Sequence, residues 1–411
     1  MVPPPILTVP TELTQQIMLE TLIANSETQR FPRPIRTEAP LAFTAVSRQW
    51  REISLNTSEL WQSIRLDDST PTVPPQVLAV WGSRARSLPR NIQLRTSDPD
   101  RAAALLAESV KSCLRWQDID LALPHESFSA LHGHGPFPVL RSICLTMRGG
   151  IASDDIVIAL PSAPLLRQLT LSDFPFLRVE MPWAQLTTLR ITVYEAAPGL
   201  AVLQRCPNIK NLVIALMDDP GLPTAMPPIV LPALQYLRSL NTHILPFVTV
   251  PSLTQLDIWG PGPSGTMEQL IDDLRALLAR SACSLKRLTY RSPRDITPAQ
   301  FLALLEAVAA VEDLELAFPP TSLLEKLRDV LQIAHVLPRL GTLRLTYGAG
   351  NQESFDPLLD ALHSRRKVVE GRATLEVFSL HLEPGANLPP AVRNQLLAFR
   401  DQGMDISVVD L

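Results

Sequence analysis

The chain has 411 residues, of which 46% are hydrophobic, and a formal net charge of −4. This length exceeds what one compact domain usually holds, so several domains or a repeat array are expected. The nearly balanced charge excludes a strongly basic surface for nucleic acid or acidic lipid, and no apolar run reaches the roughly 18 residues of a membrane span. We therefore expect neither nucleic acid nor membrane as a partner.

The cysteines are widely spaced and form no CxxC pair: Cys113, Cys144, Cys206 and Cys283. They are expected to be reduced, buried thiols rather than a disulfide framework. The opening MVPPPILTVP lacks the positive and apolar regions of a secretory signal. We therefore expect a cytoplasmic or nuclear protein.

A first helix is predicted in VPTELTQQIMLETL, residues 9–22. Pro10 suits the first helical turn. The apolar residues of this segment are predicted to share one stripe: Leu13, Ile17, Met18 and Leu22. A long polar loop that contains prolines follows at 24–38, and a surface loop of this length costs little closure entropy.

A second helical segment includes VSRQWREISLNTSELW, residues 46–61. Its apolar residues are spaced three, four and three positions apart, which predicts one helical face: Phe43, Val46, Trp50 and Ile53. Asn56 and Glu59 have the spacing of a capping box, which predicts a new helical turn there. The two segments together predict a small all-helical module.

These two segments resemble an F-box, whose pattern begins Leu-Pro-x-Glu-Leu and closes with Val-Ser-x-x-Trp and a Leu-Trp. The resemblance covers residues 6–66, with Val9 in place of the usual leucine. The stretches VWGSRARSLPRNIQLR and RWQDIDLALP are similar to the segment that joins an F-box to leucine-rich repeats in F-box/leucine-rich-repeat proteins. The resemblance implies an F-box domain at 1–66, with the insertion at 24–38, and a connecting segment at 67–110.

From residue 138 onward, a proline followed by LxxLxL keeps returning, as in PVLRSICL at 138–145 and PSLTQLDI at 251–258. The first apolar residue of each copy, its anchor, recurs at intervals of 19 to 35 residues: Leu140, Leu166, Leu186, Ile209, Leu234, Leu253, Leu285, Val311, Leu340 and Leu375. A weaker copy, WQDIDL, lies at 116–121. The alternation predicts a short strand whose apolar residues point to one side.

Several copies are predicted to continue from the strand into a helix. The segment 266–283 has Thr266 at an N-cap position, and in the segment 297–311 Thr297 precedes a proline. Further helices are predicted at 354–367 and 389–403. Such units cannot bury their apolar faces alone, so neighbouring units are expected to stack.

The repeat pattern resembles that of leucine-rich repeats, although the asparagine of that consensus is absent. The predicted fold is α/β: a small all-helical F-box module followed by a leucine-rich-repeat solenoid at 111–411. About ten to twelve irregular repeats are expected. A curved parallel sheet would form the concave face, with helices or loops on the convex face.

The F-box resemblance implies a substrate receptor of an SCF-type ubiquitin ligase. In that family the F-box docks on the Skp adaptor and through it on a cullin, while the repeats hold a target protein. The candidate adaptor-binding residues are Pro10, Leu13, Ile17, Leu22, Val46 and Trp50, of which Trp50 is also expected to brace the module internally. In the alternative interpretation, the F-box-like start only caps the solenoid of a non-catalytic interaction scaffold, and its apolar stripe is buried.

The concave strand face is the predicted target-binding surface, because an exposed tryptophan among arginines is typical of interaction hot spots. The candidate residues are Arg190, Asp257, Trp259, Arg287, Arg291, Glu315 and Arg344. The alternative interpretation is a solvated strand face of mixed charge, with Trp259 covered by the GPGPSGT segment that follows it. The identity of the target does not follow from these residues.

Catalytic motifs are not found in the sequence. GPGPSGT at 260–266 has two prolines without an N–H group and lacks the GK[ST] of a phosphate-binding loop. HGHG at 132–135 offers two imidazoles but no further metal ligand at a useful spacing. Neither GxSxG nor HExxH occurs. We therefore expect no enzymatic activity, no cofactor and no metal site.

Overall fold

The fold is given by a computed structural model of the chain. The structure describes residues 9–24, 31–70, 72–149, 158–160, 162–172, 179–193, 196–216, 227–240, 243–261, 265–292, 296–317, 323–333, 335–348, 354–367, 369–386 and 388–410. The chain forms two compact units, Met1–Val193 and Tyr194–Leu411, and each is described by itself. Both units are mixed α/β with parallel sheets.

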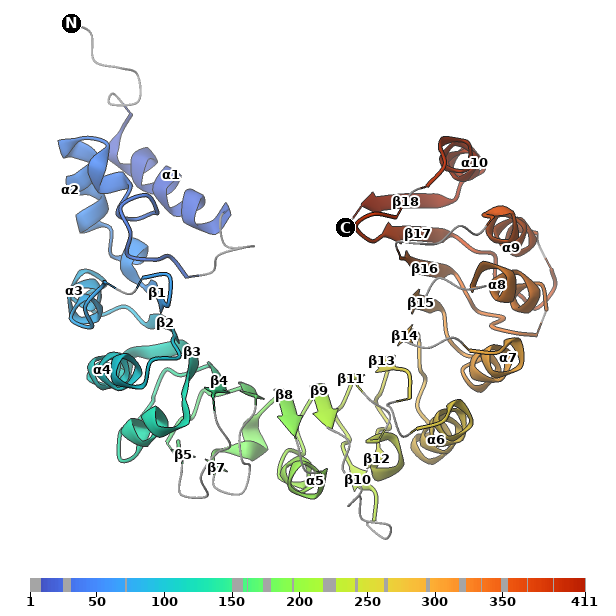
Figure 1. Cartoon of the computed structure of the whole chain (residues 1–411), viewed down its shortest axis with the longest axis horizontal. Helices are drawn as coiled ribbons and strands as arrows, with labels where there is room; N and C mark the ends of the chain where they lie inside the picture. Colours follow the sequence, from blue (N-terminus) through green and yellow to red (C-terminus); the bar gives the residue numbers. More distant parts are fainter. Residues whose placement is uncertain are drawn as a thin grey trace, which may run out of the picture. The chain divides into compact units, whose positions relative to one another are not determined.

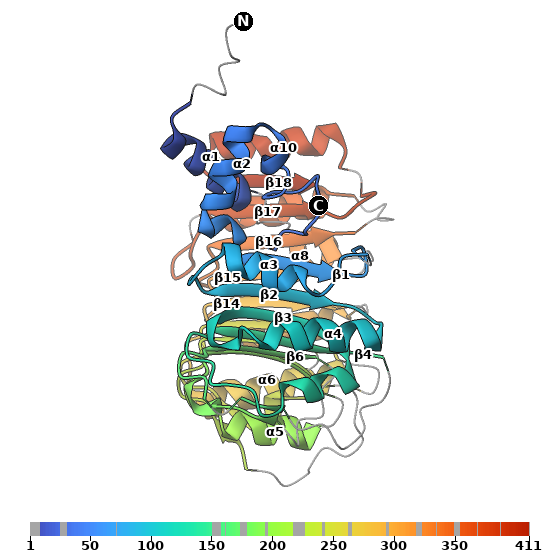
Figure 2. The ribbon, with the colours of Figure 1, turned by 90° about the vertical axis from the view of Figure 1, so that its left-hand side faces the viewer.

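The first unit contains a helical module followed by parallel strands (Figures 1 and 2). Its helices are α1 (Thr11–Ala24), α2 (Arg48–Asn56), α3 (Val77–Arg84) and α4 (Pro99–Val110), with short 3₁₀ helices η3 (Phe43–Ala45), η4 (Ser58–Trp61), η5 (Cys113–Arg115), η6 (His125–Leu131) and η8 (Trp183–Gln185). Its strands are β1 (Ser63–Asp67), β2 (Arg90–Arg95), β3 (Trp116–Pro124), β4 (Ser142–Arg148), β5 (Ile158–Ala159), β6 (Gln168–Ser172), β7 (Val179–Glu180) and β8 (Thr188–Val193). The main sheet has the order β1-β2-β3-β4-β6-β8, while β5 and β7 pair separately.

The second unit repeats strand and helix more regularly. Its helices are α5 (Ala196–Gln204), α6 (Met267–Ser281), α7 (Pro298–Ala307), α8 (Leu323–Leu331), α9 (Asp356–Arg366) and α10 (Pro390–Asp401), with 3₁₀ helix η9 (Leu245–Phe247). Its strands are β9 (Asn211–Leu216), β10 (Ile229–Val230), β11 (Tyr236–Ser239), β12 (Val248–Thr249), β13 (Gln255–Trp259), β14 (Arg287–Arg291), β15 (Asp313–Ala317), β16 (Thr342–Tyr347), β17 (Val377–Leu382) and β18 (Asp405–Asp410). The main sheet has the order β9-β11-β13-β14-β15-β16-β17-β18, and helices α6 to α10 all lie on one side of it (Figure 1).

The leucine motif of the sequence sets the register of both sheets. In the second unit Leu256 pairs with Leu288, which pairs with Leu314 and then with Leu343. All ten predicted anchors are buried. Because side chains alternate across a strand, this register places the leucines on the core side and leaves the residues between them on the opposite side. The predicted one-sided strands are therefore confirmed.

The predicted helix starts in the second unit are also confirmed. The Thr266 side chain accepts a hydrogen bond from the backbone N–H of Gln269 at the start of α6. At α7, Thr297 and Gln300 form a reciprocal capping box, and a proline occupies the first turn. These side chains satisfy backbone donors that have no partner within a helix.

The predicted continuous helix through Phe43 and Ile53 is wrong. The chain instead forms η3 and then α2, because the Ser47 hydroxyl accepts a hydrogen bond from the backbone N–H of Trp50 and begins a new helix. This break leaves Val46 exposed while Phe43 and Trp50 are buried.

The predicted capping box at Asn56 and Glu59 is also wrong. Asn56 is the last residue of α2, and its side-chain amide donates to the carbonyl of Glu52. The N-cap of η4 is Thr57, which makes no side-chain capping bond there.

The described part of the predicted loop, residues 31–38, packs against β1. The backbone N–H of Arg65 donates to the Pro32 carbonyl at 2.8 Å, and Phe31 is buried. The Arg33 side chain and backbone both donate to the Glu38 carboxylate, at 2.7 Å and 3.0 Å. This segment therefore covers the edge of β1, which would otherwise offer unpaired backbone groups.

The parallel sheet of the first unit begins earlier in the sequence than the repeated leucine motif predicted. Strand β1 begins within the range expected to be all-helical, 1–66, and ends at Asp67, while β2 lies within the expected connecting segment, 67–110. Both strands join the same sheet as β3. The division of the chain into these regions and the repeat region stays a prediction.

Two arginines are buried inside the units and hold backbone carbonyls. In the first unit, Arg90 donates to the Leu78 carbonyl at 3.0 Å and to the Ser112 hydroxyl at 3.1 Å. In the second unit, Arg365 donates to the Leu337 carbonyl at 3.1 Å. Burial lowers the pKa of each guanidinium to about 10, so both remain charged at neutral pH and bind these acceptors.

Candidate functional site

Helix α1 exposes two of the four residues of the apolar stripe that the sequence predicts, Leu13 and Ile17. Thr14 and Met18 face the core of the first unit, and the Thr14 hydroxyl donates to the Pro10 carbonyl at 3.1 Å. Leu13 is 52% exposed and Ile17 is 43% exposed. A helix that buries one threonine and one methionine while leaving a leucine and an isoleucine in water has an unpartnered apolar face.

The neighbouring segment adds a further apolar side chain to the surface of the helical module. Val46, between η3 and α2, is 53% exposed, while Leu22 at the end of α1 is partly buried. We call Pro10, Leu13, Ile17 and Val46 the N-terminal apolar patch; all four side chains are exposed.

Trp50 has a different place from the other predicted adaptor-binding residues. It is buried and makes an edge contact with Phe43, with 6.1 Å between the ring centroids. Its side chain packs η3 against α2 and so supports the position of Val46 rather than lying on the surface.

Trp61 packs the helical module against the first strand and helix that follow it. Its indole N–H donates to the Ser54 carbonyl at 2.8 Å, and its ring meets Trp81 of α3 edge to face at 4.7 Å. The guanidinium of Arg84 lies 4.3 Å from the ring centroid. The two fully buried tryptophans, with Arg84 over one of them, fix the module on the rest of the first unit.

The second unit presents a ladder of charges on the side of its sheet opposite the buried leucines, which we call the open strand face. Arg287 of β14 pairs with Asp313 of β15 at 2.5 Å, and Arg344 of β16 pairs with the other oxygen of Asp313. Arg291 pairs with Glu315 at 2.7 Å. These pairs join adjacent strands, where opposite charges across a sheet stabilise the pairing.

Asp257 of β13 lies between two guanidinium groups on this face. Its carboxylate oxygens are 3.4 Å from Nε of Arg238 and 3.8 Å from Nε of Arg291. Burial raises the pKa of Asp257, although both arginines act against that shift. The buried Oδ1 atom makes no hydrogen bond within the described residues.

Trp259 follows two positions after Asp257 on the same face and is 37% exposed. The other tryptophans of the chain, all within the described ranges, are buried. Leu240 comes one position after Ser239, which pairs with Ile258, so in this register Leu240 lies opposite Trp259. Leu240 is 41% exposed, and the two side chains place apolar surface beside the charge ladder.

The structure brings six of the seven predicted target-binding residues together on the open strand face of the second unit: Asp257, Trp259, Arg287, Arg291, Glu315 and Arg344. The seventh, Arg190, is exposed on β8 of the first unit, where it pairs in register with Thr170. Arg238 was not among the predicted residues. Its strand, β11, follows the same leucine motif, so the alternation of that motif could have identified it.

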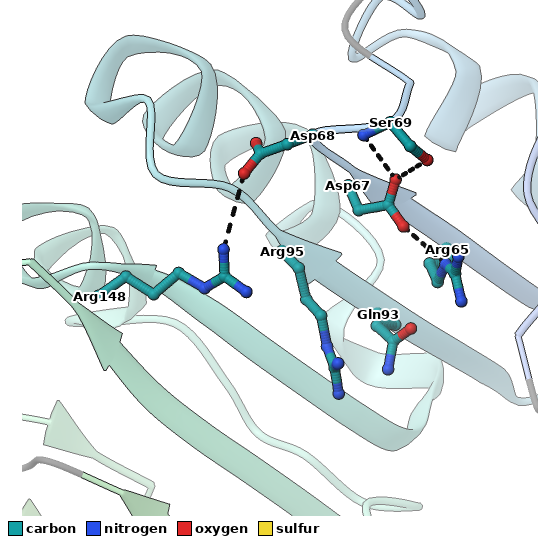
Figure 3. A pocket seen from close by; sticks show the side chains of 7 residues that line it. All are labelled: Arg65, Asp67, Asp68, Ser69, Gln93, Arg95 and Arg148. Atoms are coloured by element: carbon teal, nitrogen blue, oxygen red, sulfur yellow. Dashed lines mark hydrogen bonds and ion pairs between the residues drawn. The ribbon is translucent and has the colours of Figure 1, made fainter.

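A polar pocket of about 300 Å³ opens at the strands of the first unit, and sequence reasoning missed it (Figure 3). It is lined by Arg65, Asp67, Asp68, Ser69, Gln93, Arg95 and Arg148. Figure 3 shows Arg148 extending from β4 toward Asp68, and the two side chains are 3.6 Å apart. Arg95 and Gln93 both donate to Asp120 of β3, at 2.7 Å and 2.5 Å.

The arginines of this pocket are paired with carboxylates, so its charge is nearly balanced. Arg65 lies 2.7 Å from Asp67. Burial would raise the pKa of Asp67, but the hydrogen bonds from Ser69 and the charge of Arg65 outweigh burial and lower this pKa. The lining contains no histidine, cysteine or lysine, and its one hydroxyl, that of Ser69, donates to the Asp67 carboxylate. The alternation in SIRLD could have identified Arg65 and Asp67 as neighbours on one face.

The thiols do not form a reactive centre. All four cysteines are free, and burial raises the pKa of Cys144 to about 11 and that of Cys206 to about 12. Both therefore stay protonated at neutral pH and are poor nucleophiles. Among the residues that the structure describes, no group of three His, Cys, Asp or Glu side chains is placed to hold a metal ion.

No described helix is long and apolar enough to cross a membrane. A scan against protein-family models finds no match for this chain, and a search of curated proteins finds none either. The function must therefore be argued from the N-terminal apolar patch, the open strand face and the sequence pattern.

Proposed function

We propose that the chain is the substrate-recognition subunit of an SCF-type ubiquitin ligase. Its N-terminal helices would form an F-box that docks on a Skp adaptor and through it on a cullin. Its strand and helix units would form leucine-rich repeats that bind a target protein. The chain itself would be non-catalytic, would need no cofactor, and would act in the cytoplasm or nucleus.

The observation that carries this proposal is the N-terminal apolar patch. It lies on the segment that resembles an F-box, and it includes four of the six residues that the resemblance assigns to adaptor binding. A water-exposed leucine and isoleucine one helical turn apart offer the anchors that a partner groove takes from an amphipathic helix.

The competing function is an interaction scaffold whose N-terminal helices only cap the first strands. A cap would turn the apolar stripe of α1 toward the strands and bury it. Instead, Trp61 and Trp81 make the packing between the module and the first strands, while Leu13 and Ile17 face water. This arrangement favours a partner for α1 outside the chain.

A pull-down of the purified chain with Skp adaptor and cullin tests the proposal. The Leu13→Asp/Ile17→Asp variant should lose the complex, because each charge would have to be desolvated in an apolar contact. A Thr11→Asp/Gln16→Asp variant adds the same charge to exposed polar positions of the same helix and should still bind. Circular dichroism of each variant checks that the units remain folded.

The alternative scaffold function makes the opposite prediction. A folded wild-type chain that captures no adaptor would overturn the ligase proposal. Equal adaptor capture by the wild-type chain and the Leu13→Asp/Ile17→Asp variant would show that α1 is not the docking surface.

A further inference from the structure

We infer that the open strand face of the second unit, around Trp259, binds an extended acidic peptide segment that carries one apolar side chain. This inference rests on the proposed function and deepens it by naming the chemistry of the target. It is argued from Trp259, Leu240 and the charge ladder beside them.

Trp259 and Leu240 form a small apolar step beside the charge ladder. Trp259 ends β13 and Leu240 follows the last residue of β11, so continuing the register places them opposite each other; both are exposed, whereas the remaining tryptophans of the chain are buried. Tryptophan is among the residues that contribute most to binding when a partner covers it. An apolar side chain of the partner would cover this step and remove both residues from water.

Around the apolar step the charge that reaches solvent is positive, although the whole chain has a net charge of −4. In its pair with Asp257, the Arg238 side chain is 36% exposed and the carboxylate 9%. In the pair of Arg287 with Asp313, the corresponding values are 44% and 15%. The carboxylates lie beneath and hold the guanidinium groups outward.

These arginines keep donors available for a partner. A guanidinium has five N–H groups in a planar fork, and one carboxylate uses at most two of them well. Arg238, which pairs with Asp257, and Arg291, which lies beside Glu315 and Asp257, can therefore each donate to one further carboxylate. A partner with aspartate or glutamate side chains complements this surface.

The strand spacing sets the separation of the acidic groups. Arg238 lies on β11 and Arg291 on β14, with β13 between them, so their strands are about 10 Å apart. An extended peptide advances about 3.3 Å per residue. Arg291 also lies two residues further along its strand than Arg238, so the two positions are about 12 Å apart. Because alternate side chains of an extended peptide point to opposite sides, two acidic residues four positions apart, with the apolar residue midway between them, would face the two arginines and the apolar step together.

The same face is less suited to nucleic acid. Its four arginines, Arg238, Arg287, Arg291 and Arg344, stand among four carboxylates, Asp257, Asp313, Glu315 and, on β18, Asp405. Binding a phosphate backbone depends on several cations that no carboxylate neutralises. The apolar step would also remain uncovered by a phosphate chain.

The test uses the full chain and a fluorescein-labelled peptide in which one phenylalanine is flanked on each side by two glutamates. Fluorescence anisotropy should show saturable binding that weakens as salt is added. Acrylamide quenching of the tryptophan emission should fall on binding, because the exposed Trp259 becomes covered. A peptide with lysines in place of the glutamates, and one with alanine in place of the phenylalanine, should bind much more weakly.

Variants locate the site. Trp259→Ala and Leu240→Asp should each weaken peptide binding about tenfold or more. Leu397→Ala and Arg275→Ala change exposed side chains on helices α10 and α6 and should leave the affinity unchanged. Arg238→Ala should weaken binding and reduce its dependence on salt.

Several results would overturn the inference: no saturable binding of the acidic peptide, equal binding of the lysine peptide, or unchanged affinity in both Trp259→Ala and Leu240→Asp. Tighter binding of a single-stranded oligonucleotide than of the peptide would assign the face to nucleic acid instead. The Leu13→Asp/Ile17→Asp variant should bind the peptide like the wild-type chain. A chain that captures no adaptor but binds the peptide would therefore reject only the ligase proposal.

Discussion

Individual arginine and glutamate side chains hold segments of this fold together through hydrogen bonds and ion pairs. Arg90 and Arg365 satisfy carbonyls inside the units, while Arg33 and Glu38 tie together the segment that covers the edge of β1. The contacts of the buried Arg90 and Arg365 satisfy polar groups in places where water is scarce. The residues that make them are scattered along the sequence, so their partners become apparent only in the fold.

The Arg33 and Glu38 pair predicts how the stability of the first unit depends on pH. Burial would raise the pKa of Glu38, but the hydrogen bonds from Arg33 and the charges of Arg33 and Arg65 lower it. Because the pKa is lower in the folded state than in the unfolded state, the carboxylate stabilises the fold above its ordinary pKa of about 4.3. This contribution is lost as pH falls through the folded pKa.

The Glu38→Gln substitution should therefore lower the free energy of unfolding by about 1 kcal/mol at pH 7 and by much less near pH 3. Urea denaturation at a series of pH values measures this difference. Arg33→Gln should have a similar effect, and the double variant should cost less than the sum of the two. A cost that is the same at pH 3 and pH 7 would contradict the role of the ion pair.

At the scale of helices and strands, the sequence predicted those elements whose signals are local. The LxxLxL motif alternates from one residue to the next, so Leu256, Leu288 and Leu314 could be placed in one register before the fold was known. The caps Thr266 and Thr297 lie within one turn of the backbone groups they bind. Local geometry is what a sequence pattern can report.

The break between η3 and α2 was mispredicted because two local signals compete there, helical spacing and a capping serine. Phe43, Val46 and Trp50 have helical spacing, but the Ser47 side chain caps a new helix between them. Helical spacing alone does not show where a cap interrupts the chain. Strands β1 and β2 were overlooked for a different reason. In the LxxLxL motif the first leucine comes three positions before the first buried residue of the strand, whereas here the spacing is four, as between Leu60 and Ile64.

The candidate sites were predictable to different degrees. The exposure of Leu13 and Ile17 could not be read from spacing, because a stripe at these positions could equally face the core. The partners of Asp257, and those of Asp120 beside the pocket, come from neighbouring strands about 20 to 35 residues away. Only strand register brings such residues together, so the ion pairs were not predicted.

The capping box of α7 predicts a measurable contribution from one exposed side chain. Thr297→Ala removes the hydroxyl that accepts the Gln300 backbone N–H and should destabilise the second unit by about 1 kcal/mol in urea denaturation. Gln300→Ala removes the reciprocal bond to the Thr297 backbone N–H and the bond that Gln300 donates to the exposed Glu268 carboxylate; solvent-exposed bonds contribute little, so it should cost less. Thr297→Ser keeps the hydroxyl and should be nearly neutral. Equal stability of the alanine and serine variants would contradict this role.

At the scale of the whole chain, each strand contacts mainly the strands before and after it in the sheet order. Stability in such an array is approximately a sum of units and of the interfaces between neighbours. Contacts are also denser within each of the two units than between them. A core defect should therefore loosen its own neighbours more than distant strands.

Two matched core substitutions test this prediction. Leu145 of β4 and Leu345 of β16 hold the same position in the LxxLxL motif, and both are buried. Replacing either by alanine should cost about 2–5 kcal/mol locally, because a cavity forms where the leucine packed. Hydrogen exchange measured by mass spectrometry should then show faster exchange in β3, β4 and β6 for Leu145→Ala, and in β15, β16 and β17 for Leu345→Ala. Faster exchange across both units in either variant would show instead that the chain unfolds as one cooperative body.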